Sequence, residues 1–118
     1  MSHHIIMNKN LFPDMYEGIK EFEMRVYNNE VQYYKDDDTV TIEDEMTRSF
    51  FTAVMTRVNY FCSIDDAFEI YDHKKFVPHA MSKENAKELY EKIPNFKEEA
   101  INHGVLVFKL TRISEIIE

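Results

Sequence analysis

The sequence predicts an α+β fold, a small mixed β-barrel of about five to six strands with short helices covering its openings. Three observations support this prediction. The expected elements follow the order β-α-β-β-β-α-α-β, and the middle strands are close enough to be joined by hairpins. The third is a run over residues 50–61 rich in β-branched and aromatic side chains, which is typical of a long strand. A chain of 118 residues without linkers or repeats suits one domain over residues 1–118.

The N-terminal part predicts a strand, a short helix and a second strand. Ile5–Met7 begins the first strand, and residues 1–4 are expected to be a frayed end. Apolar residues at helical spacing over 12–19 predict a short helix that ends at Gly18, where a positive φ is common. Over residues 21–27 the period changes to two, which predicts a strand with one apolar and one ionisable face.

The middle of the chain predicts a turn followed by two strands. Asp36, Asp37 and Asp38 form a solvated turn or, alternatively, offer oxygens to a hard cation. The segments 39–43 and 50–61 are the two strands, and Cys62 at the end of the second is expected to be a small core residue.

The C-terminal part predicts two helices and a last strand. Ser63 begins a short helix, and Ser82 begins a second one, which carries an apolar stripe including Tyr90 and ends at Pro94. The strand after Gly104 is apolar on both faces, which places it inside the sheet.

Composition excludes several functional classes. The formal net charge of −8 argues against a protein that coats nucleic acid by bulk electrostatics. With two glycines, a glycine-rich phosphate loop is excluded. One cysteine rules out an internal disulfide framework, and no apolar run is long enough for a membrane helix, so we expect a cytoplasmic protein that contacts no membrane. The sequence predicts no cofactor and no metal site.

The informative stretch runs from Gly18 to Arg25. Lys20 follows the glycine turn, and Glu23 and Arg25 lie two apart on one strand face, close enough to pair. A lysine and an arginine held by a carboxylate suit recognition of a phosphate or a polar base edge. The alternative interpretation is a solvated strand face with a weak surface ion pair.

This stretch has the G-x-K-x-x-E-x-R pattern of the ASCH domain, the activating signal cointegrator homology family. The resemblance extends over the flanking helix, the turn near Asp37 and the closing strand, from about residue 5 to 112. It implies a barrel similar to the PUA domains, which are RNA-binding modules, with the motif lining a cleft between barrel and helices. The residues carried over are Gly18, Lys20, Glu23 and Arg25. Asp37 replaces the family's turn glycine; aspartate tolerates left-handed backbone geometry, although its charge makes that rim less attractive to phosphate.

The same resemblance raises an enzymatic alternative. Some small bacterial ASCH-like proteins are amidohydrolases that act on acetylated cytidine, using the motif lysine, a threonine and a glutamate. Here Lys20 matches, Glu23 stands in the threonine's place, and the glutamate's place falls near Pro78 and His79. His79 is a candidate base near neutral pH. Because two of the three groups are not matched, the sequence favours a binding protein over an enzyme.

Further basic residues lie outside the motif. Lys74 and Lys75 stand beside Tyr71 and Phe76 in an expected loop, where they could offer cations and stacking surfaces to an unpaired base. Alternatively, the lysines are solvated and the aromatic rings close the core. Arg57, in the long strand, could face the same cleft.

Together these observations predict a protein that binds RNA or a nucleoside- or nucleotide-like ligand. Lys20 and Arg25 would contact phosphate or base, and Glu23 would orient Arg25 or accept a hydrogen bond from an exocyclic amine. Arg57, Lys74 and Lys75 are further candidate ligand-binding residues. The amidohydrolase is one alternative, and an adaptor whose acidic surface meets a basic protein partner is another.

Overall fold

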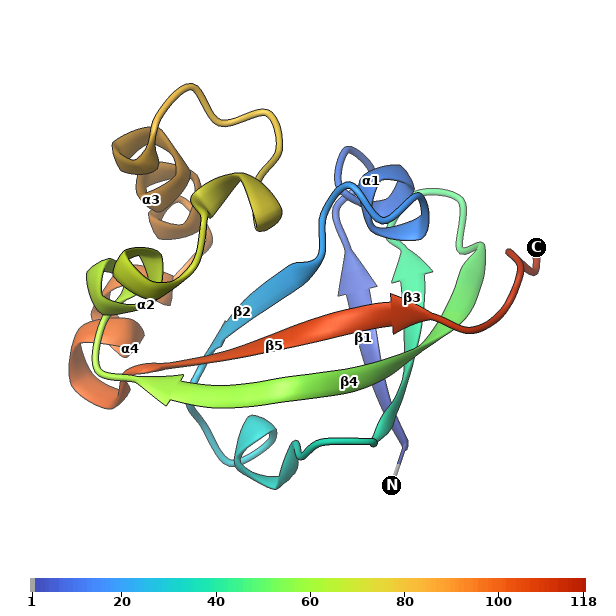
Figure 1. The fold of residues 1–118 in the computed structure, drawn as a ribbon, viewed down its shortest axis with the longest axis horizontal. Helices are drawn as coiled ribbons and strands as arrows, with labels where there is room; N and C mark the ends of the chain where they lie inside the picture. The colour runs from blue at the N-terminus through green and yellow to red at the C-terminus, as the bar shows by residue number, and fades with distance from the viewer. Residues whose placement is uncertain (1) are drawn as a thin grey trace.

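A computed structural model describes residues 2–118. The strands are β1 (Ser2–Met7), β2 (Phe22–Val26), β3 (Thr39–Asp44), β4 (Phe50–Phe61) and β5 (Val105–Arg112). The helices are α1 (Phe12–Tyr16), α2 (Ile64–Ile70), α3 (Lys83–Glu91) and α4 (Phe96–His103), and two short 3₁₀ helices are η1 (Val31–Tyr33) and η2 (His73–Lys75). Figure 1 shows α2, α3 and α4 gathered at one end of the sheet and α1 at the other.

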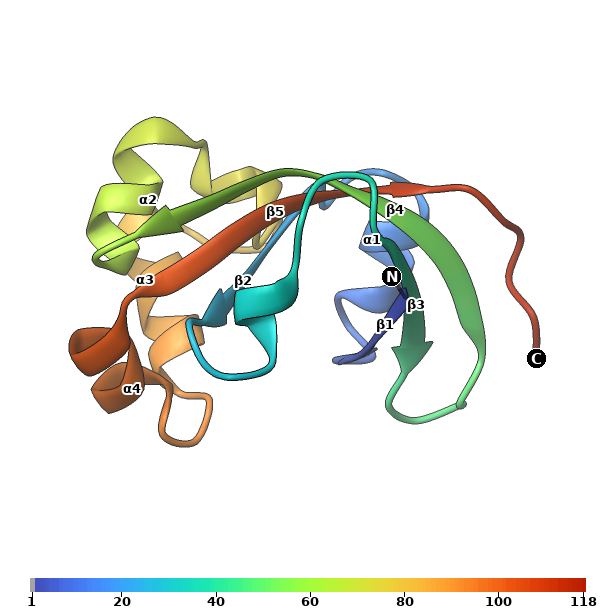
Figure 2. The ribbon, with the colours of Figure 1, turned by 90° about the horizontal axis from the view of Figure 1, so that it is seen from below.

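The five strands form one mixed sheet in the order β1-β3-β4-β5-β2. β1 pairs with β3 in parallel, and the other neighbours are antiparallel. The sheet curls strongly into a half-barrel, which is clearest from below (Figure 2). The expected α+β fold is confirmed, and β5 lies inside the sheet as its double apolar faces predict.

β4 has an irregularity in its pairing with β5. The register of β4 against β5 shifts between Thr56 and Asn59, and Arg57 in that interval has a φ of 52°. An extra residue of this kind increases local strand twist. β4 can therefore pair with β3 through its first residues and still follow β5 along most of its length.

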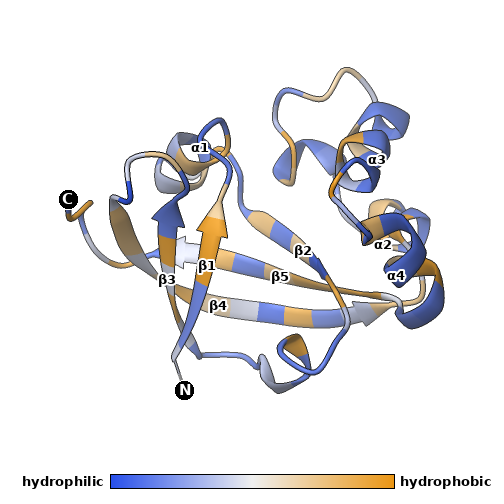
Figure 3. Cartoon of the chain, turned by 180° about the vertical axis from the view of Figure 1, so that it is seen from behind, coloured by the Kyte–Doolittle hydropathy of each residue, from blue (hydrophilic) through white to orange (hydrophobic). Residues whose placement is uncertain are grey.

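The half-barrel does not close, because β1 and β2 are its two free edges. Seen from behind, these two strands lie in front of β4 and β5 and are not paired with each other (Figure 3). We call the boundary between β1 and β2 the seam. The seam is important for the site described below, because the two edge strands β1 and β2 approach each other there next to the helical layer.

Two apolar clusters stabilise the fold. One fills the half-barrel and includes Met7, Phe51 and Phe108; the other packs the helical layer against β2 and β5 and includes Met24 and Phe76. Burying a side chain of this size contributes about 1.5–3 kcal/mol relative to exposure. The helical layer is thus a second packed unit on the outer side of the sheet.

The structure differs from the sequence prediction at three places. Ser2–His4, expected to be frayed, belong to β1, where His3 Nε2 lies 2.8 Å from Asp38 Oδ2; Met1 lies outside the described residues. The helix α4 was not predicted. Cys62 is exposed, because it follows β4 where the chain leaves the sheet, so its expected core position is wrong. Among residues 2–118, no helix is long and apolar enough to cross a membrane.

Two turn geometries were predicted correctly. Gly18 has a φ of 81° at the end of the α1 turn, and Asp37 has a φ of 73° in the turn before β3. Both residues therefore occupy the left-handed region, which glycine enters freely because it has no Cβ and which aspartate enters more readily than most residues.

Candidate functional site

Lys20 lies inside the protein and is fully buried. The turn at Gly18 directs the chain inward, where the backbone N–H groups of Ile19 and Lys20 donate to the Asp14 carbonyl at 2.9 and 3.0 Å. Lys20 Nζ donates to the carbonyl oxygens of Phe22 and Phe76, each at 2.6 Å, and to Glu23 Oε1 at 3.4 Å. An ammonium group has three protons, and these acceptors account for all of them.

This environment sets the electrostatics of Lys20. Burial lowers its pKa, and the neighbouring Glu23 carboxylate opposes that shift. The two carbonyls come from β2 and from the segment just after η2, so Lys20 joins the half-barrel to the helical layer. A direct contact between Lys20 and a ligand would require it to leave these acceptors.

Glu23 connects Lys20 with two further residues. Its Oε1 accepts hydrogen bonds from the Met24 backbone N–H at 2.9 Å and from the Tyr90 hydroxyl at 3.0 Å. Its Oε2 lies 3.5 Å from Arg25 Nη2, so the predicted pairing of Glu23 with Arg25 is confirmed. Burial raises the pKa of Glu23, but the charges of Lys20 and Arg25 outweigh it and hold the pKa below its usual value. Glu23 is therefore ionised at neutral pH.

Tyr90 stays protonated in this network. Burial and the adjacent Glu23 carboxylate raise the pKa of Tyr90 well above its ordinary value. Its hydroxyl donates to Glu23, and at neutral pH it is not available as a phenolate base or nucleophile. Its role is to fix α3 against β2.

Arg25 is the part of the motif that solvent reaches. Its side chain is 37% exposed, and Nη2 also lies 3.5 Å from the Ile6 carbonyl oxygen across the seam. Within residues 2–118, the polar contacts of this guanidinium are both at that long distance. Most of its five donors remain free for another partner.

Two hollows adjoin this charged network. The first, which we call the helical groove, has a volume of about 370 Å³. One wall is formed by Asn8, Asn10 and Leu11 after β1, and the other by Val77, His79, Leu89, Tyr90 and Ile93 from the helical layer. The second, which we call the seam hollow, has a volume of about 290 Å³ and is lined by residues of β1, β2 and the β2–β3 connection, Arg25 and Tyr34 among them.

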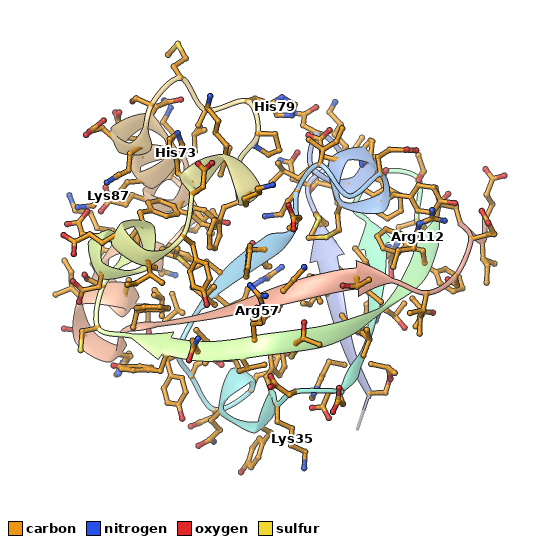
Figure 4. All side chains as sticks on the ribbon, viewed as in Figure 1. Lys35, Arg57, His73, His79, Lys87 and Arg112 are labelled. Atoms are coloured by element: carbon orange, nitrogen blue, oxygen red, sulfur yellow. The ribbon has the colours of Figure 1, made fainter. Side chains whose placement is uncertain are left out.

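His79 stands at the edge of the helical groove. Its Nε2 lies 2.7 Å from Asp14 Oδ2 on α1, and its side chain is 60% exposed. Figure 4 shows His79 beside the gap between the helical layer and α1. This close contact brings α1 and the helical layer together at the outer edge of the groove, although Asp14 Oδ2 accepts no hydrogen bond from the residues that the structure describes.

The other predicted site residues do not join this cluster. Arg57 is exposed on β4, and Figure 4 places it over the middle of the sheet, far from His79. Lys74 is exposed, and Lys75 Nζ forms an ion pair with Glu21 at 2.6 Å. Phe76 is fully buried, so the interpretation in which the loop's aromatic rings close the core is the correct one.

The aspartate turn serves the backbone. Asp38 Oδ2 accepts from the Lys35 N–H at 3.3 Å, and Asp36 Oδ1 accepts from the Val58 N–H at 3.0 Å. In the part of the chain that the structure describes, no group of three or more His, Cys, Asp or Glu side chains is placed to hold a metal ion.

Sequence reasoning missed Tyr90, Asn8 and Asn10. Its periodicity places Tyr90 in an apolar stripe, although a buried tyrosine hydroxyl needs a hydrogen-bond partner and is itself a signal of a polar contact. Asn8 and Asn10 stand in a turn without a periodic pattern. Nothing local indicates that this turn faces a helix about 80 residues later in the chain.

The fold matches those of two solved structures. The hypothetical protein PH0355 superposes with a TM-score of 0.82 at 18% sequence identity, covering 96% of this chain and 100% of that chain. Protein PF0455 from Pyrococcus furiosus superposes with a TM-score of 0.75 at 16% identity, covering 98% of this chain and 100% of that chain. A scan against protein-family models finds no match, and no curated protein matches the sequence. The chain therefore shares its curled α+β half-barrel with these two proteins.

Proposed function

We propose that this protein belongs to the ASCH family and binds an unpaired nucleobase or nucleoside in the helical groove. The observation that carries the proposal is the groove itself, which lies next to the Glu23 network of the G-x-K-x-x-E-x-R motif. Small-molecule sites are mostly apolar hollows of about 300–1,000 Å³ with a few converging polar groups. The groove has that character, with a volume of about 370 Å³.

Its lining suits the chemistry of a base. Leu11, Leu89 and Ile93 offer apolar surface for the faces of a flat ring. Asn8 and Asn10 carry amides, each with a donor and an acceptor group, which is the pattern that pairs with the edge of a base. A ligand with both apolar faces and a polar edge satisfies both kinds of wall.

Charge favours a neutral ligand here over a polyphosphate. Near the groove, the formal charges of Lys20 and Arg25 balance those of Asp14 and Glu23. No lysine or arginine stands among the residues that line the groove. Together with the net charge of −8, this supports a compact ligand rather than a long nucleic acid backbone.

In this proposal the motif residues act mainly through position. Lys20 holds Glu23 and the segment after η2, and Glu23 holds Tyr90 and Arg25. Arg25 is the motif side chain open to a ligand. The groove keeps its shape because these charges are satisfied inside the protein.

The test is titration of the four ribonucleosides, followed by amide chemical shifts and calorimetry. Nucleosides should shift the resonances of Asn8, Asn10 and α3. Leu89→Trp, which fills the groove, should abolish binding. Ile70→Trp, at an exposed position on α2 outside the groove, is the matched control and should bind normally. If no nucleoside shifts these resonances at millimolar concentration, the proposal is wrong.

One observation favours a second candidate, hydrolysis of an amide on a modified nucleoside. The Asp14 carboxylate lies 2.7 Å from the His79 imidazole at the edge of the same groove, and a carboxylate beside a histidine is a pairing suited to a general base. This mechanism would use His79 in place of Lys20, because all three ammonium protons of Lys20 are donated to acceptors inside the protein. Release of cytidine from acetylated cytidine, lost in His79→Ala, would support it; absence of turnover by the intact protein would exclude it for that substrate.

A further inference from the structure

We infer that the ligand is a dinucleotide unit of an unpaired strand, with one base in the helical groove, its neighbour in the seam hollow and the linking phosphate at Arg25. This inference rests on the proposed function and extends it to a second binding position. It gives a role to the seam hollow and to the exposed guanidinium.

The two hollows follow one another along one strand. His4, Ile5 and Ile6 of β1 line the seam hollow, and Asn8, which follows β1, begins the wall of the helical groove. Residues in a strand advance by about 3.3 Å each. Ile5, in the middle of the first wall, and Asn8, the first residue of the second, are therefore roughly 10 Å apart, a span that an extended, unstacked dinucleotide can cover.

Residues of β2 and α3 also show that the helical groove and the seam hollow are neighbours. Tyr90 lines the helical groove and Arg25 lines the seam hollow. Both bind Glu23, Tyr90 to Oε1 and Arg25 to Oε2. One buried carboxylate therefore separates the two hollows, and Arg25 stands at their boundary.

Arg25 suits a single phosphodiester. Its two polar contacts are both 3.5 Å long, longer than a good N–H···O bond, so a phosphate oxygen can displace or share them. Arginine binds phosphate through paired donors. Glu30, which also lines the seam hollow, would repel a second phosphate there. The charge pattern thus admits one phosphate and disfavours a chain of them.

Three ligands that carry the same base distinguish the contributions of the first base, the phosphate and the second base. These are the nucleoside, the nucleoside monophosphate and the dinucleoside monophosphate, each titrated by calorimetry. The dinucleoside monophosphate should bind about tenfold or more tightly than the nucleoside, because it adds a charge-assisted contact and a second base. Its affinity should fall as salt is raised, while that of the nucleoside stays nearly constant.

Two pairs of variants show which residues account for the higher affinity for the dinucleoside monophosphate. Arg25→Gln should reduce the affinity for the dinucleoside monophosphate to near that for the nucleoside, whereas Arg57→Gln, at an exposed arginine elsewhere on the sheet, should not. Ile6→Trp should fill the seam hollow and remove the contribution of the second base. Its control is Ile19→Trp, which has the same 55% exposure and lies outside both hollows.

The outcomes distinguish this inference from the proposed function. If the nucleoside binds and the dinucleoside monophosphate binds no tighter, the two-position inference fails and the groove proposal stands. If the nucleoside monophosphate binds as tightly as the dinucleoside monophosphate, the phosphate contact alone explains the gain and the second base position is refuted. If none of the three binds, both proposals fail.

Discussion

Lys20→Met is the sharpest test of what the motif lysine does. The variant keeps the length and apolar stem of the side chain but removes the ammonium. The carbonyls of Phe22 and Phe76 each lose a 2.6 Å hydrogen bond, and Glu23 loses its buried cation. Removing one partner of a buried ion pair costs about 3–5 kcal/mol, because the other charge stays buried, and Glu23 would keep only its 3.5 Å pair with Arg25. Since small domains are stable by only about 5–15 kcal/mol, we expect a large loss of stability in a protein that still folds.

The matched control is Lys75→Met. The distance from Lys75 Nζ to Glu21 Oε2 is 2.6 Å, much shorter than the 3.4 Å from Lys20 Nζ to Glu23 Oε1. Lys75 is half exposed, however, and water screens the pair, so its loss should cost about 0–1 kcal/mol. Burial, rather than distance, decides the difference between the two variants.

The assay is urea unfolding followed by circular dichroism, which gives the free energy of unfolding from the midpoint and slope. Adding Glu23→Gln to Lys20→Met should restore part of the loss, because the carboxylate that has lost its buried cation is then uncharged. A cost below about 1 kcal/mol for Lys20→Met would mean that Lys20 behaves as a surface lysine, and our account of the buried network would be wrong.

Three further predictions follow. Gly104→Ala should destabilise the protein by about 3 kcal/mol or more in urea unfolding, because its φ of 80° and ψ of −172° exclude a side chain and an added Cβ would clash with Tyr60. Gly18→Ala, which has open space around the added Cβ, should cost only about 1–2 kcal/mol. Equal costs for the two variants would contradict this reasoning. The folded pKa of Glu23 lies below its unfolded value of about 4.3, so its stabilisation is complete above that pH and disappears as the pH falls through the folded pKa. Urea midpoints across this range should therefore fall less steeply with acid in Glu23→Gln than in the wild type, and parallel curves would refute the assignment. Cys62 should react with a thiol reagent in the native state at a rate near that of the unfolded chain, since it is exposed; protection would refute its position.

Much of the fold could be predicted because it depends on local patterns. The β-branched and aromatic run gave β4 its full extent of Phe50–Phe61, and Ser63 and Ser82 cap α2 and α3 by accepting from the backbone N–H three residues later. Each of these signals depends on only a few neighbouring residues. Tertiary packing favours the same elements, so the local prediction holds in the folded protein.

The helix α4 was missed because its pattern is weak. Only Phe96 and Ala100 are buried, and the helix starts from a left-handed Asn95 whose side chain makes no capping bond. The glycine at its end is the signal that could have indicated it, since Gly104 follows a helical run at the usual C-terminal position. The apolar run after Gly104 is the stronger local pattern, and it predicts only the strand that follows.

The candidate site was predicted in part, for a physical reason. Spacing along one strand showed that Glu23 and Arg25 are neighbours, which is a local relation. The burial of Lys20 depends on the Phe76 carbonyl, which is 56 residues away, and the hydroxyl bonded to Glu23 belongs to Tyr90, which is 67 residues away. Such partners are set by topology, so the local charge pattern does not indicate that Glu23 and the preceding Lys20 are enclosed.

The length of β4 affects how the protein unfolds. Its first residues pair with β3 over the half-barrel cluster, while its end at Phe61 pairs with Val105 under the helical layer. β5 in turn contributes Phe108 to one cluster and Val107 to the other. Neither cluster can lose its sheet without disturbing the strands that support the other. The half-barrel and the helical layer should therefore melt in a single cooperative transition, with amide hydrogens in the paired middle of β4 and β5 exchanging last.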